Sequence, residues 1–270
     1  MSLIDSHCHL DSAEFDPDRD AVVARARAAG ITGQVIPAIR AEDWPALAAL
    51  CARTPGLHAA FGMHPLYLAE HRDEHLVLLR ERLAQGPAVA VGECGLDYFA
   101  PGLAVDAQRH FFHAQLALAR AFGLPVIVHA RRAVEEVIHT LRGYPGVCGV
   151  VHSYSGSEEQ ANQLWKMGFM LGIGGPLSYS RAHRLRRIVA AMPLEFLLLE
   201  SDAPDQPLAT QRGARNEPSS VALVLEEITA LRTESREVIA AATTANARRL
   251  FRLAADPAAA AAHPASSSSG

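Results

Sequence analysis

The stretch Gly123-Leu124-Pro125-Val126-Ile127-Val128-His129 places a short, wholly apolar run between two longer amphipathic segments, residues 104–122 and 132–142. A strand that is apolar on both faces is typical of a parallel sheet covered by helices on each side, because both of its faces are buried. Gly123 follows the first amphipathic segment directly, at a position where glycine commonly ends a helix. This stretch therefore predicts one helix–strand–helix unit of an α/β fold.

The same unit recurs along the chain. We expect eight strands, at Leu3–Cys8, Gln34–Ala38, His58–Phe61, Val89–Gly92, Val126–Val128, Gly149–His152, Phe169–Ile173 and Phe196–Glu200. We expect helices near Arg19–Ala29, Glu42–Arg53, Asp73–Ala84, Ala104–Phe122, Arg132–Arg142, Glu158–Met167, Arg181–Ala191, Ser219–Arg232 and Glu234–Leu253. Strict alternation with eight strands predicts a single-domain (β/α)8 TIM barrel. A doubly wound open sheet is the alternative, but eight similar repeats and the lack of a glycine-rich dinucleotide loop favour closure.

The barrel domain is expected to span residues 1–253. The remaining stretch, residues 254–270, is rich in alanine and serine and cannot bury apolar area, so we expect a disordered low-complexity tail. With 270 residues, of which 49% are hydrophobic, the chain can bury one large core.

Net charge and cysteine usage limit which classes of partner and which cellular compartment are expected. The net charge is −4, without the basic excess of proteins that grip long duplex DNA, so any nucleic acid is expected to be held by a small local site. The four cysteines show no CxxC spacing, which favours a reducing compartment. No signal-like segment or membrane-length apolar run is present in the sequence, so a cytoplasmic protein without a membrane partner is expected, and no obligate protein partner is evident.

Histidines and acids occur where the predicted strands end. His7 and His9 form an H-x-H pair whose side chains share one face of a strand, although by spacing alone they are as easily two polar residues at a strand end. The other candidates each follow an apolar run; they are Glu93, His129, His152 and Asp202. The carboxyl ends of the strands form the active-site face of this barrel, so these side chains are predicted to meet there and bind metal.

Imidazole and carboxylate together suit Zn, Mn, Co or Ni, and a more oxygen-rich site suits Mg. Glu93 lies between the N-terminal pair and the C-terminal histidines in chain order, where a carboxylate can bridge two divalent ions about 3.5–4 Å apart. Asp202 is then expected to ligate one ion and to orient or deprotonate the attacking water. The sequence therefore predicts a hydrolase with two divalent metal ions as cofactors, whose identity stays open.

These residues belong to longer stretches that resemble the TatD family of metal-dependent hydrolases, within the amidohydrolase superfamily. The stretches are Asp5–His9, Gly62–Pro65, Gly92–Tyr98, Val128–Arg131, His152–Gly156, Glu200–Pro204 and Arg215–Pro218. The resemblance implies a (β/α)8 barrel with one ion held by His7, His9, Glu93 and Asp202, and a second held by Glu93, His129 and His152. It also implies a deoxyribonuclease that acts on single strands from an end.

Four further residues are expected to contact the substrate. His64, in Gly62-Met63-His64-Pro65, is predicted to act catalytically on a phosphate or leaving group, against the alternative of a loop histidine. Arg131 can grip phosphate or form a surface ion pair, and Arg215 can touch substrate or pair with Glu217. Tyr154, like Tyr98, can stack on a base or simply pack over the barrel mouth. A basic run after the seventh strand can receive a polyanion or form a solvated helix face; it comprises Arg181, Arg184, Arg186 and Arg187.

Three functions remain open from the sequence. The leading hypothesis is a metal-dependent phosphodiesterase, a deoxyribonuclease of the 3'-5' exonuclease type that acts on nucleic-acid ends. The second is a metal-dependent hydrolase of a small phosphate or carboxylic ester, lactone, amide or aminoacyl ester, because function resides in the site and not in the barrel. The third is a non-catalytic binding protein that keeps the barrel.

Overall fold

The structure, a computed structural model, describes residues 2–254, so residues 255–270 of the predicted tail lie outside the described range. The strands are β1 (Leu3–Asp5), β2 (Ile31–Pro37), β3 (Leu57–Ala60), β4 (Val91–Asp97), β5 (Val126–Arg131), β6 (Gly149–Val151), β7 (Phe169–Ile173) and β8 (Leu197–Leu199). The α-helices are α1 (Arg19–Ala28), α2 (Trp44–Arg53), α3 (Asp73–Gln85), α4 (Val105–Phe122), α5 (Val134–Arg142), α6 (Glu158–Lys166), α7 (His183–Ala191), α8 (Val221–Thr229) and α9 (Arg236–Phe251). Within residues 2–254, no helix combines the length and apolarity needed to cross a membrane.

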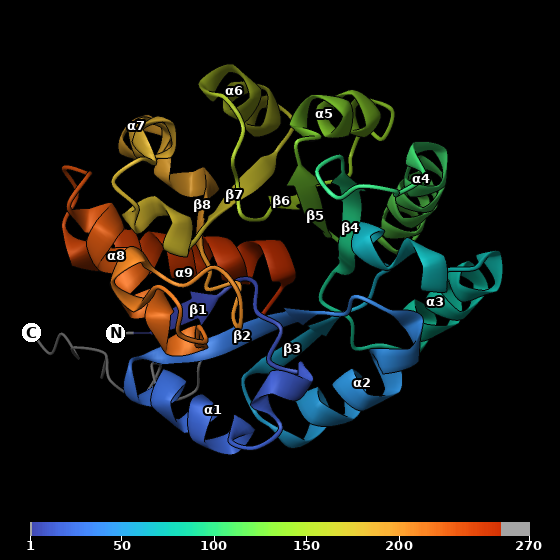
Figure 1. Cartoon of the computed structure of the whole chain (residues 1–270), viewed down its shortest axis with the longest axis horizontal. Coiled ribbons are helices and arrows are strands. Elements are labelled where there is room, and N and C mark those ends of the chain that lie inside the picture. The colour runs from blue at the N-terminus through green and yellow to red at the C-terminus, as the bar shows by residue number, and fades with distance from the viewer. Residues whose placement is uncertain (1, 255–270) are drawn as a thin grey trace, which may run out of the picture.

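All strand pairs are parallel, in two arcs of order β1-β2-β3 and β4-β5-β6-β7-β8. Backbone hydrogen bonds span both seams between the arcs. At one seam the N–H of Gly92 donates to the carbonyl of Phe61 over 2.9 Å, and at the other the N–H of Ser6 donates to the carbonyl of Leu199 over 2.9 Å. The strands thus surround a common axis, with helices outside them (Figure 1), and the predicted (β/α)8 barrel is confirmed.

The barrel interior is an apolar core of its own. Each strand, or the residue just before it, contributes one buried side chain to this cluster; these are Ile4, Val35, Ala60, Ala90, Ile127, Val150, Met170 and Leu198. Helix α9 adds Ala247, Leu250 and Phe251 to the same cluster and contacts β1 and β8. The helix therefore closes one end of the barrel, and the polar residues that follow the strands are left at the other end.

Several predicted strand boundaries were wrong. The second strand begins at Ile31 instead of Gln34, and the fifth ends at Arg131 instead of Val128. Two further differences bear on the site. The first strand ends at Asp5, not Cys8, because the chain beyond it bonds alternately to neighbours on two sides: the N–H of Cys8 donates to Val35 of β2, and that of His9 to Ala203 beyond β8. The fourth strand runs on to Asp97 instead of ending at Gly92, with a register shift between Val91 and Cys94. His7 and His9 thus lie beyond a strand, whereas Glu93 lies within one.

Candidate metal centre

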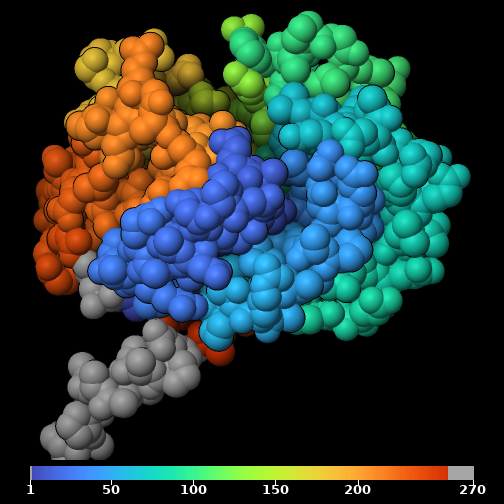
Figure 2. Space-filling view, turned by 60° about the horizontal axis from the view of Figure 1, so that its bottom comes forward, coloured from blue at the N-terminus to red at the C-terminus, as the bar shows by residue number. Residues whose placement is uncertain are grey.

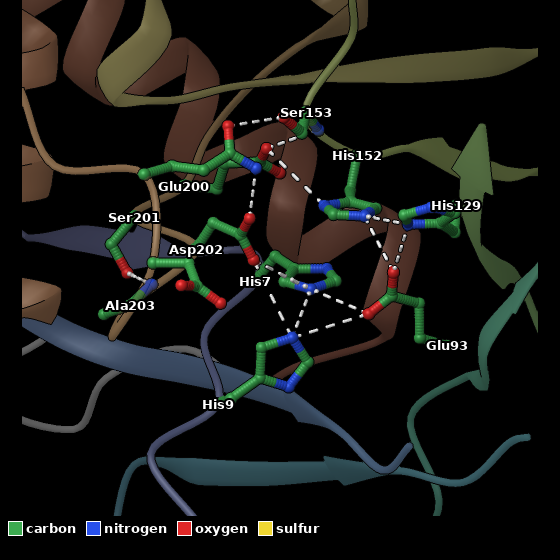
Figure 3. Close-up of polar contacts among 12 residues, drawn as sticks. His7, His9, Glu93, His129, His152, Ser153, Glu200, Ser201, Asp202 and Ala203 are labelled. Carbon is green, nitrogen blue, oxygen red and sulfur yellow. Dashed lines mark hydrogen bonds and ion pairs between the residues drawn. The ribbon is translucent and has the colours of Figure 1, made fainter. Parts of the chain in front are cut away.

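The six residues predicted to bind metal meet at the carboxyl end of the barrel (Figure 3). They come from the segment after β1, from β4 and β5, and from the segments after β6 and β8; they are His7, His9, Glu93, His129, His152 and Asp202. Most of this cluster is buried, and all of its members except His7 line a cavity of about 1060 Å³. Side chains more than 190 residues apart in the sequence therefore share one site.

One group of donor atoms surrounds the Oε2 atom of Glu93. The Nε2 atoms of His7 and His9 lie 3.2 and 3.5 Å from Oε2 and 3.2 Å from each other. Oδ1 of Asp202 lies 3.5 Å from the His7 nitrogen and 3.7 Å from the His9 nitrogen. Each of the two imidazole nitrogens thus lies within 4 Å of both carboxylates.

A second group surrounds the other oxygen of the same carboxylate. Oε1 of Glu93 lies 2.8 Å from Nε2 of His152, 3.0 Å from Nδ1 of His129 and 3.0 Å from Nε2 of His64. The rings of His7 and His152, one from each group, stack with centroids 3.8 Å apart. Glu93 therefore stands between two neighbouring sets of donor atoms, one on each of its oxygens.

Neighbouring hydrogen bonds assign the tautomers of two imidazoles. Nε2 of His129 lies 2.9 Å from Oδ2 of Asp97, so this nitrogen carries a proton; its Nδ1 lies 3.0 Å from Oε1 of Glu93 and would turn a lone pair toward a cation bound there. His64 also carries its proton on Nε2, but it is this nitrogen that faces Glu93, because its Nδ1 accepts the N–H of Leu66 over 3.1 Å. His129 can therefore ligate a cation through Nδ1, whereas neutral His64 is a hydrogen-bond donor to the shared carboxylate.

The charges in the cluster are strongly coupled. Burial lowers the pKa of His7 well below its usual value and that of His64 to about 4. Burial also lowers the pKa of His152, but the Glu93 carboxylate outweighs it and raises this pKa to about 10. Burial raises the pKa of Glu93, yet the surrounding histidines, His64 first, hold it well below the usual range. The Glu93 carboxylate thus stays ionised although it is buried.

The donor set fits divalent cations. Oε2 of Glu93 and Nδ1 of His7 are both buried, and neither has a hydrogen-bond partner. Three groups have possible ligand atoms that all lie within 4.8 Å of one another; these are His7, Glu93 and His152, then His7, His9 and Asp202, and finally His64, Glu93 and His129. Imidazole nitrogens that face carboxylate oxygens are the ligands preferred by borderline divalent metals. Cations bound there would supply the positive charge that a buried carboxylate needs.

Hydrogen bonds hold Asp202 from behind. The side-chain amide of Gln206 donates to Oδ2 of Asp202, and its Oε1 accepts the hydroxyl of Ser153 over 2.8 Å. The backbone N–H of Ser153 donates in turn to Oε1 of Glu200 over 2.5 Å, and this oxygen lies 3.9 Å from Nδ1 of His152. Connected hydrogen bonds therefore hold Asp202, Gln206, Ser153 and Glu200 in place, and Glu200 lies within ion-pair distance of His152.

Three of the four predicted substrate contacts line the cavity, His64 among them, and one does not. Arg131 is exposed and lines the cavity, and Tyr154 also lines it, although it is buried and its hydroxyl donates to the carbonyl of Ser157 over 2.6 Å. Arg215 instead pairs with Asp18 over 2.8 Å and with Glu217 over 3.2 Å. This pairing joins the segment after β8 to the start of α1, which lie against each other in Figure 2.

The four arginines of the basic run after β7 lie at different surfaces. Arg181 and Arg184 line the cavity, whereas Arg186 lies 3.4 Å from Glu227 of α8. Arg187 faces a small separate hollow beside His183. Half of the run therefore lies at the barrel mouth.

Sequence reasoning missed the carboxylates that orient the ligands. Asp97 and Glu200 are both buried and stand behind His129 and His152, respectively. Both belong to the stretches that carry the family resemblance, and an acid at the end of an apolar strand is the signal that could have identified them. This signal could not show which histidine each carboxylate contacts, because that histidine comes from a different strand of the barrel.

Comparison with known proteins agrees with this geometry. The family model described as "TatD related DNase" matches residues 4–252. The Escherichia coli K12 protein "Uncharacterized metal-dependent hydrolase YjjV" is 40% identical over 254 residues, which cover 93% of this chain and 98% of that relative. The crystal structure of YjjV superposes with a TM-score of 0.90 at 38% identity, covering 93% of this chain and 98% of the other. The Cronobacter sakazakii protein "3'-5' ssDNA/RNA exonuclease TatD" is 34% identical over 265 residues, covering 95% of this chain and all of that relative. The chain belongs to the TatD related DNase family.

Proposed function

We propose that this protein is a metal-dependent phosphodiesterase that shortens single-stranded nucleic acids from the 3' end. The observation that carries the proposal is the Glu93 carboxylate, shared by two sets of donor atoms at the floor of a cavity with arginines on its wall. The named activity of the Cronobacter sakazakii relative supports the choice of substrate.

Two divalent ions fit the two sets of donor atoms. We assign the first to His7, His9, Asp202 and Glu93, and the second to His129, His152 and the same Glu93. When bound, such ions neutralise phosphate charge and lower the pKa of water toward 7. Mg, Mn, Zn, Co and Ni are all compatible with nitrogen and oxygen donors, so the metal is a variable of the experiment below.

The chain's own residues orient the substrate and move the proton. Asp202 is placed to accept the proton of the attacking water at Oδ1, because its Oδ2 is already held by Gln206. His64 keeps its Nε2 proton beside Glu93 and can offer it to a phosphate oxygen that enters the cavity. Arg131 and Arg181 line the same cavity, and neither forms an ion pair with a carboxylate in the described part of the chain, so both can bind phosphate.

The test is metal-dependent degradation of a labelled strand. A 5'-fluorescein single-stranded DNA is incubated with EDTA-treated protein, with and without added Mg or Mn, and the products are separated by length. We expect no cleavage in EDTA and, on adding metal, a ladder that shortens from the 3' end. A lack of metal-dependent cleavage, with hydrolysis of a small ester or lactone instead, would assign the protein to the alternative hydrolase class.

His129→Ala should lower kcat/KM on this strand by about a thousandfold, equivalent to about 4 kcal/mol, because the variant lacks a metal ligand. The matched control is His139→Ala, an exposed histidine of α5 away from the cavity lining, which should stay within about twofold. Thermal unfolding without metal should change far less than turnover. An unfolded His129→Ala barrel would show that this histidine holds the fold together instead of serving the reaction.

Asp97→Asn should weaken metal binding by about 10–100-fold, because an amide oxygen accepts the His129 proton less strongly than a carboxylate does. Burial raises the pKa of Asp97, but hydrogen bonds from His129 and the backbone outweigh it and lower this pKa to about 2, so a charged acceptor is being removed. Titration calorimetry with Mn would measure the change, with Asp106→Asn on the exposed start of α4 as control. Equal affinities in Asp97→Asn and wild type would exclude this orienting role.

We assign the activity to one domain, residues 1–253. A cytoplasmic location also remains our proposal. The four cysteines, all of which carry free thiols, fit the reducing compartment that it requires.

A further inference from the structure

An exposed aromatic ring lies beside the cavity and has no role in the chemistry above. Phe99 follows β4 and leaves 46% of its surface exposed, although large apolar side chains are usually buried. Two guanidinium groups lie over its ring: Cζ of Arg131 is 3.9 Å from the ring centroid and Cζ of Arg132 is 4.6 Å from it. Arg131 also lines the cavity, so the ring adjoins the cavity wall.

The two guanidinium groups are not engaged by carboxylates. Among residues 2–254, neither Arg131 nor Arg132 forms an ion pair. Other arginines of the described chain do; for example, Arg25 lies 2.8 Å from Glu217, and Arg40 lies 2.8 Å from Asp43. In a chain of net charge −4, two unpaired cations beside the cavity favour an anionic ligand there.

One carboxylate ties this ring to the metal centre. Oδ2 of Asp97 accepts the Nε2 proton of His129 over 2.9 Å. Oδ1 of the same side chain accepts the backbone N–H of Phe99 over 2.8 Å and that of Ala100 over 2.9 Å. The backbone that carries the ring is therefore fixed relative to His129, and a group bound on the ring would have a set position relative to the reacting phosphate.

We propose that Phe99, Arg131 and Arg132 form a nucleotide platform, on which an unpaired base next to the cleaved phosphodiester stacks while the guanidinium groups bind the adjacent phosphate. The proposal rests on the phosphodiesterase function and deepens it by naming the feature that selects single strands. Aromatic rings and guanidinium planes stack on bases of any sequence, and a base inside a duplex is not free to do so. The platform therefore selects for unpaired ends without reading sequence.

Equilibrium binding tests the platform independently of turnover. A labelled single-stranded oligothymidylate and a copy with abasic residues at its 3' end are titrated in EDTA and followed by fluorescence anisotropy. Phe99→Ala should raise the Kd for the base-bearing strand about tenfold, the order expected for one lost stack, and should leave that for the abasic copy within about twofold. Phe99→Leu, which keeps an apolar side chain but no aromatic ring, should resemble Phe99→Ala. The control is Val77→Ala, a comparably exposed side chain on α3.

Phe99→Trp supplies a signature that a merely structural role would not produce. The new indole should retain the wild-type Kd, and its fluorescence should fall when the base-bearing strand binds and stay constant with the abasic copy. In the metal-dependent reaction, Phe99→Ala should raise KM about tenfold relative to wild type and leave kcat within about twofold.

The possible outcomes separate the platform from the function. Metal-dependent cleavage with identical Kd values in wild type and Phe99→Ala would overturn the platform and leave the function standing. Lack of cleavage with base-dependent binding that Phe99→Ala weakens would overturn the function and support the platform. Equal loss of affinity for the two strands in Phe99→Ala would also overturn it, because the ring would then only hold the arginines in place.

Discussion

Glu93→Gln should abolish metal-dependent hydrolysis, with a fall in kcat/KM of about ten-thousandfold or more, equivalent to roughly 5.5 kcal/mol. The substitution conserves volume but removes the negative charge that both sets of donor atoms share. It also turns a buried amide toward imidazoles that now face a carboxylate, so His152 and His129 lose an anionic partner together. Steady-state kinetics on the labelled strand and bound metal by elemental analysis would measure the effect.

Glu200→Gln is the control for Glu93→Gln, and a smaller loss of activity is expected from it. Glu200 is as buried as Glu93, but it lies behind His152 instead of between the two sets of donor atoms. Its loss should cost about 10–100-fold, the usual effect of removing a group that orients a metal ligand. The central role of Glu93 is contradicted by equal losses in the two variants, or by full metal content in Glu93→Gln.

Gly95→Ala should destabilise the barrel by about 3 kcal/mol or more and lower activity by at least about 100-fold. Gly95 has φ of +140°, and a Cβ built there would lie 2.1 Å from the backbone oxygen of His129. The two residues are paired in the β4–β5 register, so the collision cannot be relieved by a side-chain rotation and must move the strand that carries His129. Urea unfolding monitored by circular dichroism, together with kcat/KM, would measure both effects.

Gly102→Ala separates the collision from backbone strain. Gly102 also has a positive φ, +80°, but a Cβ there would meet no atom within 4 Å. This control should cost about 1 kcal/mol, the ordinary penalty of the left-handed region, and leave activity unchanged. A Gly95→Ala variant no less stable than Gly102→Ala would mean that β4 and β5 separate without cost.

The sequence was sufficient for the architecture because the deciding signals are local. Apolar runs such as Val126–Val128 and the helical spacing around them predict strands and helices without reference to the rest of the chain. Strand ends were less certain. The first strand ends at Asp5 because the chain beyond it bonds to β2 and to the segment after β8, and pairing across a barrel seam leaves no mark in a local pattern.

The six donor residues were predicted as a group because they follow apolar runs and match family motifs. The carboxylates that contact these donor residues were not predicted. Asp97 serves His129 on the next strand and also fixes the backbone of Phe99, and both relations depend on which strands are neighbours. Arg215 illustrates the converse: a motif residue expected to touch substrate or pair with Glu217 forms ion pairs with both Asp18 and Glu217, because the fold brings α1 beside it.

Helix α9 has a consequence for synthesis on the ribosome. Its residues Ala247, Leu250 and Phe251 fill the barrel end that eight earlier strands leave apolar, and they emerge after all of those strands. Until then the nascent chain already carries the six predicted metal ligands, but the apolar end of its barrel is exposed to water. Chaperones bind exposed apolar surface of this kind. A chain that ends before residue 247 should therefore expose this apolar surface and be a better substrate for proteases than the chain in which α9 has docked.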